Sequence, residues 1–183
     1  MNRYIALLGG INVSGRRVKM DHLRHLFEQL GFLNVETFIA SGNVFFKSTE
    51  QNSRALQTLV ERHLEAELGF KVPTFIRTPE DLSVVAANWP FHEPLSPGHT
   101  LSIMLLDEPL AEEMEQALVA YQTPMDAFRV SGQEVYWLCR GKITESMVNW
   151  KLLGKGVTLP RLTVRNVTTI RKLASKYGGF RTR

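Results

Sequence analysis

The sequence has a single cysteine and no long apolar run. Cys139 has no second cysteine to form an internal disulfide bond with, and it ends the apolar run 135–139, so we expect a buried structural thiol. No apolar stretch reaches the ~18 residues that a membrane-spanning helix needs, and the apolar run near Met1 is too short for the core of a signal peptide. We therefore expect a cytoplasmic protein without a membrane segment.

The common catalytic and metal-binding signatures are also missing from the sequence. There is no phosphate-binding Gly-Lys-Ser/Thr loop, no Rossmann glycine triplet, no paired-histidine zinc helix and no nucleophile elbow. His22 and His25 lie three residues apart on a predicted helix, but no cysteine or carboxylate pattern accompanies them. We expect no metal site and no cofactor, name no catalytic residue, and leave open whether the protein is an enzyme.

Acidic residues are scarce in the last quarter of the chain, which makes this quarter strongly basic. Residues 140–183 contain eleven Lys and Arg against one acid, Glu145, a net charge of +10, whereas residues 1–139 carry a net charge of −6. This asymmetry favours an acidic partner, which could be a nucleic acid, a nucleotide or a protein surface. The alternative is that the two parts of the chain attract each other within the molecule.

Hydrophobic periodicity predicts the order β-α-β-β-α-β over the first eighty residues. The apolar run 3–8 is a strand, and apolar residues recur at helical spacing over 20–30 and 56–68. Each helix ends at a glycine, Gly31 or Gly69, in the C′ position. The runs 35–40 and 44–47 form a hairpin across Ser41-Gly42-Asn43, and 72–77 is a further strand. This order is that of the ferredoxin-like fold.

The second half of the chain repeats the pattern less completely. A helix over 78–88 leads into a proline-rich connector, 89–99, which separates the two halves. Residues 100–183 then predict a strand (101–106), a helix (109–121), a hairpin (127–130 and 135–139), a helix (144–153) and a last helix from about Thr163. No clear fourth strand is visible. We expect an α+β protein with two ferredoxin-like halves, antiparallel sheets and a C-terminal helix, the second half being incomplete.

Residues 9–19 are the most suggestive stretch for a binding site. They join a strand to a helix start and combine glycines with Arg16, Arg17 and Lys19. Free backbone N–H groups and the helix dipole favour an anion at such a place. Two further polar stretches are the basic segment around Arg165-Asn166, where Thr163 could cap the last helix, and the turn Ser41-Gly42-Asn43. We expect this turn at the opposite end of the sheet from the exit of the first strand, about 16 Å away at ~3.3 Å per residue.

Recognition of RNA by an aromatic platform is disfavoured. Ferredoxin-like RNA-binding domains stack bases on aromatic side chains of the two central strands. Here those strands, 4–8 and 44–46, are apolar on both faces, which indicates that both faces are covered. Nucleic acid would then have to bind through its phosphates to the basic region 140–183.

Several of these motifs together closely resemble the bacterial domain-of-unknown-function 1697 family. The resemblance is carried by Ile5-Ala6-Leu7-Leu8-Gly9-Gly10-Ile11-Asn12-Val13, Val18-Lys19-Met20, Leu30-Gly31-Phe32, Ser41-Gly42-Asn43-Val44, Val72-Pro73, Arg77-Thr78 and Thr163-Val164-Arg165-Asn166. It implies an α+β fold with ferredoxin-like halves and no established activity. The chain departs from the family at Gly9, where members usually have Arg, and at Val167, where they usually have Trp.

These observations lead to one main hypothesis and two alternatives. The main hypothesis is that an anionic or phosphate-bearing small molecule binds in a cleft between the two halves. The residues expected to contact it are Asn12, Ser14, Arg16, Lys19, Ser41, Asn43, Arg165 and Asn166. The alternatives are sequence-independent nucleic-acid binding through 140–183 and a protein-interaction or structural role. The oligomeric state is left open.

Overall fold

The computed structural model describes residues 1–13, 15–39, 42–150 and 159–181. The chain divides into two compact units: unit 1 comprises Met1–Val84 and Lys172–Arg183, and unit 2 comprises Val85–Arg171. In the described part of the chain, no helix is both long and apolar enough to cross a membrane.

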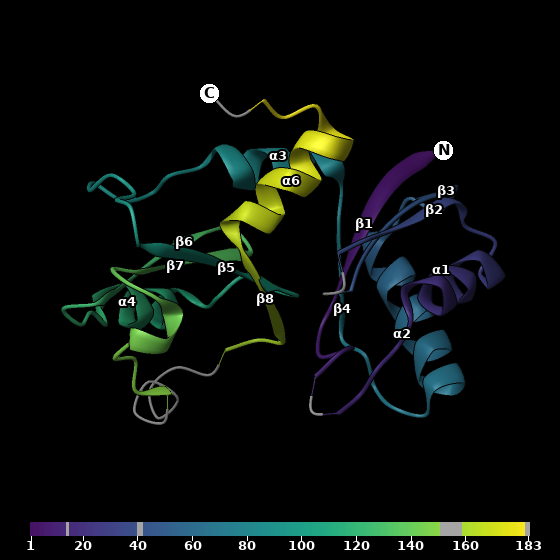
Figure 1. The fold of residues 1–183 in the computed structure, drawn as a ribbon, viewed down its shortest axis with the longest axis horizontal. Helices are drawn as coiled ribbons and strands as arrows, with labels where there is room; N and C mark the ends of the chain where they lie inside the picture. The colour runs from purple at the N-terminus through teal and green to yellow at the C-terminus, as the bar shows by residue number, and fades with distance from the viewer. Residues whose placement is uncertain (14, 40–41, 151–158, 182–183) are drawn as a thin grey trace. The chain divides into compact units, whose positions relative to one another are not determined.

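Unit 1 is built around a four-stranded antiparallel sheet with the strand order β2-β3-β1-β4. Its elements in chain order are β1 (Asn2–Leu8), α1 (Met20–Gln29), β2 (Leu33–Phe38), β3 (Asn43–Ser48), α2 (Ser53–Leu68) and β4 (Thr74–Arg77). Helices α1 and α2 lie together on one face of the sheet (Figure 1). The predicted ferredoxin-like arrangement is confirmed.

Local signals delimit these helices, and the end of α2 at Gly69 is as predicted. Leu23, Leu26 and Phe27 form the buried side of α1. Asn52 caps α2, since its side chain accepts the backbone N–H groups of Arg54 and Ala55 at 2.9 and 3.1 Å. Gly69 ends α2 with a φ of 75°, in the left-handed region that favours glycine.

The expected position of the turn between β2 and β3 is wrong. Because β1 and β3 are antiparallel, Leu7 at the end of β1 pairs with Asn43 at the start of β3. The backbone N–H of Leu8 donates to the carbonyl of Gly42 at 2.8 Å. The turn therefore lies beside the exit of β1, not at the far end of the sheet.

The second face of this sheet is also covered, as the apolar central strands predict. It receives the end of the C-terminal helix α6 (Val167–Gly178), whose residues from Lys172 onward belong to unit 1. The Tyr177 ring stacks on Phe45 with centroids 4.3 Å apart and planes 3° apart. The Oη of Tyr177 donates to Glu36 at 3.1 Å, and Arg3 donates to the Tyr177 carbonyl at 3.0 Å. Phe45 is thus unavailable as a platform for bases.

Helix α3 (Pro79–Ala87) follows β4 and begins as its sequence predicts. Thr78 and Asp81 cap it reciprocally: the Thr78 side chain accepts the Asp81 N–H at 3.0 Å, and the Asp81 carboxylate accepts the Thr78 N–H at 2.8 Å. After α3, Trp89 and Phe91 pack against each other in the proline-rich connector, with ring centroids 5.3 Å apart.

Unit 2 has the same sheet topology as unit 1. Its elements are β5 (Thr100–Leu106), α4 (Glu112–Ala120), β6 (Asp126–Ser131), β7 (Glu134–Cys139), the 3₁₀ turn η1 (Ile143–Glu145) and β8 (Leu162–Asn166). The strand order is β6-β7-β5-β8, all pairs being antiparallel. Two four-stranded antiparallel sheets with helices confirm the predicted α+β class.

The last strand of unit 2 corrects the sequence interpretation. Leu162–Asn166, where we expected the last helix to begin, forms β8 and pairs with β5, so the fourth strand is present. Its residues alternate between buried and exposed, with Thr163 and Arg165 buried, as in a strand. Helix α6 begins only at Val167, and Asn166, not Thr163, caps it by accepting the N–H of Thr168 at 2.8 Å.

The segment 143–149 also differs from the sequence prediction, which placed a helix over 144–153. In the structure the 3₁₀ turn over Ile143–Glu145 is followed by irregular backbone over 146–149, and residues 151–158 lie outside the described residues. The buried Asp126 carboxylate holds this segment, accepting the Ser146 hydroxyl and the Met147 N–H at 2.8 Å each. These side-chain contacts compete with regular helical hydrogen bonds.

Candidate anion-binding site

The loop between β1 and α1 is anchored at both ends by buried apolar residues. Ile11 and Val18 are 2% and 8% exposed and belong to the core of unit 1. Asn12 closes the loop between them, because its Oδ1 accepts the N–H of Val18 at 2.7 Å and its Nδ2 donates to the Val18 carbonyl at 3.4 Å. A further backbone bond joins the Arg16 N–H to the Val13 carbonyl at 3.0 Å. The basic residues that follow are thereby presented on a closed loop.

The basic side of this loop lines a pocket of about 450 Å³. The pocket lies where the start of α1 meets the end of α2. Its lining comprises four basic side chains, one acid and three apolar residues: Arg16, Arg17, Lys19, His22, Glu67, Val18, Leu68 and Phe70. Two residues of the sequence prediction, Arg16 and Lys19, are brought together here.

An aromatic ring holds Arg16 in this pocket. The guanidinium carbon of Arg16 lies 4.4 Å from the ring centroid of Phe70, a cation–π geometry. Within the described residues, Arg16, Arg17 and Lys19 form no ion pair. A guanidinium group on an aromatic ring keeps its N–H edge available to an anion.

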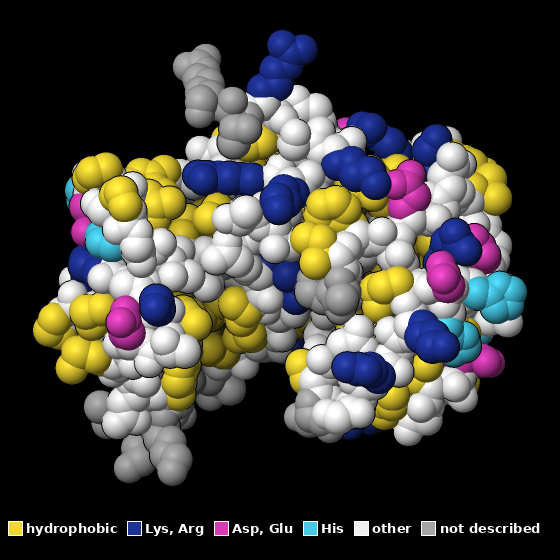
Figure 2. Space-filling view, in the orientation of Figure 1, with side chains coloured by type: hydrophobic (Ala, Val, Ile, Leu, Met, Phe, Trp, Pro, Cys, Tyr) yellow, Lys and Arg dark blue, Asp and Glu magenta, His cyan; other side chains and the backbone are white. Residues whose placement is uncertain are grey.

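The rest of α1 behaves differently. Arg24 lies 3.7 Å from Asp21 and 3.8 Å from Glu28, and His25 lies 3.8 Å from Glu28. On the face shown in Figure 2, Lys, Arg and His side chains over α1 lie next to Asp and Glu side chains. Along α1 and the loop before it, the Lys and Arg side chains without an acidic partner in the described residues are therefore those of the pocket.

The other residues of unit 1 that were predicted to contact the ligand are not among those that line this pocket. Asn43 is fully buried, and its Nδ2 donates to the Phe38 carbonyl at 3.0 Å across the hairpin. Asn12 is occupied with Val18, as described above. Ser14 and Ser41, two further predicted contacts, lie outside the described residues.

Arg165 and Asn166 belong to unit 2. Arg165 is 8% exposed, and its Nη1 donates to the Thr163 hydroxyl at 2.8 Å and to the Val164 carbonyl at 2.9 Å. Burial lowers the pKa of Arg165 to about 10, which leaves the guanidinium charged at neutral pH. Asn166 is the cap of α6.

Several cations of the basic last quarter pair with acids from the acidic part of the chain. Arg140 forms a two-point pair with Glu93, Arg161 lies 2.8 Å from Asp107, and Lys176 lies 2.7 Å from Glu36. Each pair lies within one unit. This favours the interpretation in which part of the charge asymmetry is compensated inside the molecule.

The geometry of the described residues does not favour a metal site or a nucleophilic cysteine. Among the residues that the structure describes, no three His, Cys, Asp or Glu side chains gather in a way that could hold a metal ion. Cys139 is buried, as predicted, and its thiol donates to the Lys142 carbonyl at 3.3 Å. Burial, followed by the nearby charge of Asp126, raises the pKa of this thiol, so the thiolate needed for nucleophilic chemistry is disfavoured.

Sequence reasoning did not assign roles in the site to His22, Glu67, Leu68 and Phe70. These residues line the pocket because the start of α1 lies beside the end of α2, and the sequence does not show that these two helix ends are neighbours. A periodic pattern reveals each helix but not which ends come together.

Fold and site together define an α+β protein with two ferredoxin-like units and a basic pocket in the first. A family model described as a protein of unknown function (DUF1697) matches residues 1–136. The chain belongs to this family.

A solved structure shares the fold of this chain. The conserved bacterial protein SP0830 from Streptococcus pneumoniae has a similar fold, with a TM-score of 0.76 and 24% sequence identity over 97% of this chain and 99% of that one. No curated protein matches the sequence.

Proposed function

We propose that the protein binds an anionic, phosphate-bearing small molecule in the pocket formed by the loop 9–19 and the facing ends of α1 and α2. The observation that carries the proposal is the presence of Arg16, Arg17 and Lys19 around one pocket, none of them in an ion pair within the described residues. Like charges held close together repel one another, so a bound anion would remove an unfavourable interaction.

The loop and the helix start add to this electrostatic preference. Lys19 stands at the N-cap of α1, but its side chain makes no capping hydrogen bond. The first N–H groups of a helix have no intrahelical acceptor and carry a partial positive charge. An anion beside Lys19 could accept from these groups as well as from the side chains.

The apolar part of the lining favours a ligand that is more than a bare phosphate. Leu68 and Phe70 are partly buried and lie on the same wall as Arg16. A phosphorylated small molecule could place its phosphate against the cations and its carbon skeleton against this wall. We further propose that the protein acts in the bacterial cytoplasm, a reducing compartment that suits a single buried cysteine.

The test is calorimetric titration with inorganic pyrophosphate at low salt. We expect saturable binding to the wild type. Replacing Arg16→Gln together with Lys19→Gln should weaken it by about tenfold or more, because each tenfold corresponds to ~1.4 kcal/mol and two charge-assisted contacts are removed.

Arg24→Gln is the matched control, since Arg24 lies on α1 but outside the pocket and is paired with Asp21 and Glu28. It should leave the affinity nearly unchanged. Absence of binding to the wild type, or an equal loss in the double variant and the control, would contradict the proposal. Binding of a DNA oligonucleotide that is unaffected by the double variant, with no binding of pyrophosphate, would favour the nucleic-acid alternative.

A further inference from the structure

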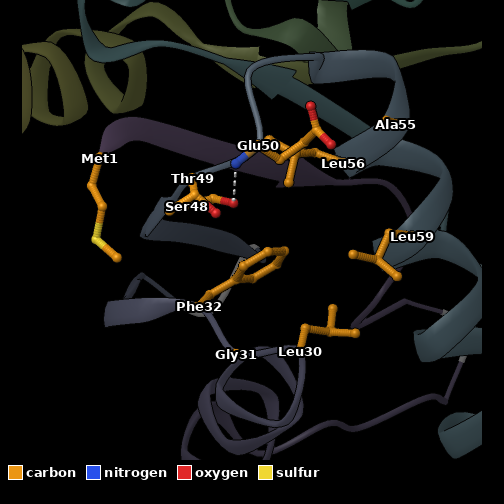
Figure 3. Close-up of a pocket in the computed structure, with 10 residues that line it drawn as sticks. All are labelled: Met1, Leu30, Gly31, Phe32, Ser48, Thr49, Glu50, Ala55, Leu56 and Leu59. Carbon is orange, nitrogen blue, oxygen red and sulfur yellow. Dashed lines mark hydrogen bonds between the residues drawn. The ribbon is translucent and has the colours of Figure 1, made fainter.

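A second pocket, of about 370 Å³, lies at the opposite end of the same two helices in unit 1. It is bounded by the end of α1, the segment after β3 and the first turns of α2. The residues that matter for its chemistry are Met1, Leu30, Phe32, Ser48, Leu56 and Leu59. Figure 3 shows the side chains of Phe32, Leu30 and Leu59 around one open space.

The floor of this pocket is part of the rigid core. Leu56 is fully buried and Phe32 is 6% exposed, and the Phe32 ring stacks on Phe46 with centroids 4.4 Å apart. At the mouth, Leu59 and Met1 are 36% and 69% exposed. A ligand would therefore contact a fixed apolar floor and remove exposed apolar side chains from water.

The polar side of the pocket is preformed by a chain of hydrogen bonds. Ser48 Oγ accepts the N–H of Glu50 at 3.1 Å, and the Glu50 carboxylate accepts the N–H groups of Gln51 and Asn52 at 2.8 and 2.7 Å. The Tyr4 hydroxyl donates to the Glu50 carbonyl at 2.9 Å. These bonds hold the segment between β3 and α2 in one conformation, so little ordering is required on binding.

The side chains of this pocket offer no positive charge to an anion. None of its lining side chains is Lys, Arg or His, and the one ionised side chain among them is that of Glu50. That carboxylate is engaged with Gln51 and Asn52 and points away from Phe32 and Leu30 (Figure 3). The end of α1 and the start of α2 carry partial charges of opposite sign, which largely cancel. An anionic ligand would lose its hydration without gaining a cationic side chain as a partner, whereas a neutral ligand needs none.

The Ser48 hydroxyl is a buried hydrogen-bond donor on the wall of the pocket. Ser48 is 8% exposed, and its oxygen accepts from Glu50, but its hydroxyl hydrogen has no acceptor among the residues that the structure describes. A buried hydroxyl gains by donating to an acceptor that enters the pocket.

We propose that this pocket is a second ligand site, which takes a small, neutral, largely apolar molecule with a hydrogen-bond acceptor directed at Ser48. Its volume suits a single ring with a short substituent, since ligand pockets start at about 300 Å³. The site is independent of the anion pocket, because the two share no lining residue.

The experiment is an NMR titration of the ¹⁵N-labelled full chain with acetophenone, a neutral aromatic ketone, and with benzoate, its anionic counterpart. Acetophenone should cause saturable shifts of the amide signals of Phe32, Ser48 and Leu59, and benzoate should bind there at least tenfold more weakly. Ser48→Ala should reduce the affinity for acetophenone severalfold.

Two matched variants locate the site. Ala55→Leu fills the pocket from an exposed position of α2, and Ala66→Leu makes the same change at an exposed position of the same helix outside the pocket. Binding that is retained with Ala66→Leu and lost by tenfold or more with Ala55→Leu supports the proposal. Absence of saturable shifts in the wild type, binding that survives Ala55→Leu, or benzoate binding as tightly as acetophenone would overturn it.

Discussion

Gly42 approaches Ile11 so closely that a β-carbon on Gly42 would lie 2.6 Å from Cγ2 of Ile11. The same β-carbon would lie 3.1 Å from Cβ of Leu8, and the Gly42 carbonyl already accepts the Leu8 N–H. This contact joins the turn between β2 and β3 to the loop that follows β1. A residue without a side chain at position 42 therefore lets Ile11 pack where it does at the start of the loop that carries the proposed anion site.

We expect Gly42→Ala to destabilise the protein by more than Gly69→Ala. Both glycines have a positive φ, 74° and 75°, so both substitutions cost about 1–2 kcal/mol for the left-handed conformation. Only Gly42 also meets Ile11, and forcing extra atoms into a packed place costs a further ~1–3 kcal/mol. Urea unfolding of both variants measures the difference. Equal losses of unfolding free energy in the two variants would contradict this prediction, because they would mean that Ile11 moves aside without cost.

Much of the fold could be predicted from the sequence, because each element carries its own local signal. Leu23, Leu26 and Phe27 at helical spacing indicate α1, and Gly69 marks the end of α2. Strand β8 was missed for a physical reason. Of its five residues only Thr163 and Arg165 are buried, and neither is apolar. The two apolar residues, Leu162 and Val164, are at the less buried positions, so the strand lacks the run of buried apolar residues by which strands are identified.

The candidate site was predictable only in part. Arg16 and Lys19 stand in a glycine-containing loop before a helix, which is a local feature. Phe70, which lies under Arg16, is more than fifty residues away in the sequence. Asn43 was predicted to contact a ligand because it is polar, but in the structure its side chain satisfies a buried backbone carbonyl. A polar residue in a turn can either contact a ligand or satisfy a backbone group, and only the tertiary contacts show which of these two roles it has.

The stack of Tyr177 on Phe45 should stabilise unit 1 substantially. Tyr177→Ala removes a ring that is 8% exposed and leaves Phe45 uncovered, so we expect a loss of about 3 kcal/mol in the free energy of unfolding. Tyr177→Phe keeps the stack and removes only the hydrogen bond to Glu36, which should cost about 1 kcal/mol or less. Urea unfolding tests this order. If the two variants were equally stable, the stack would contribute nothing.

Asp126 should make the stability of unit 2 sensitive to acid. Burial raises the pKa of its carboxyl group, but hydrogen bonds from Trp137, Thr123, Ser146 and Met147 outweigh burial and lower the pKa below its ordinary value. The ionised carboxylate therefore stabilises the fold above the pKa of the unfolded chain, about 3.9, and this contribution is lost as the pH falls through the lower folded pKa.

We expect Asp126→Asn to lower the free energy of unfolding at pH 7 by about 2–4 kcal/mol, because the amide brings N–H donors to a place already filled with donors. The difference from the wild type should shrink as the pH falls below ~4. Tryptophan fluorescence during urea unfolding at several pH values measures it. Asp21→Asn, at a side chain that is 94% exposed, is the control and should leave the acid dependence unchanged. A difference that is independent of pH would contradict this account of Asp126.

Asn12 should couple the stability of the loop to its affinity for anions. Asn12→Ala leaves the Val18 N–H without its acceptor, which should cost about 1–2 kcal/mol of stability. It should also weaken pyrophosphate binding severalfold, since Arg16 and Lys19 would no longer be held on a closed loop. Asn12→Asp keeps the Oδ1 acceptor but adds a negative charge, so it should weaken binding while changing stability less. Urea unfolding and calorimetric titration separate the two effects. An unchanged affinity in Asn12→Ala would mean that binding does not depend on the closed loop.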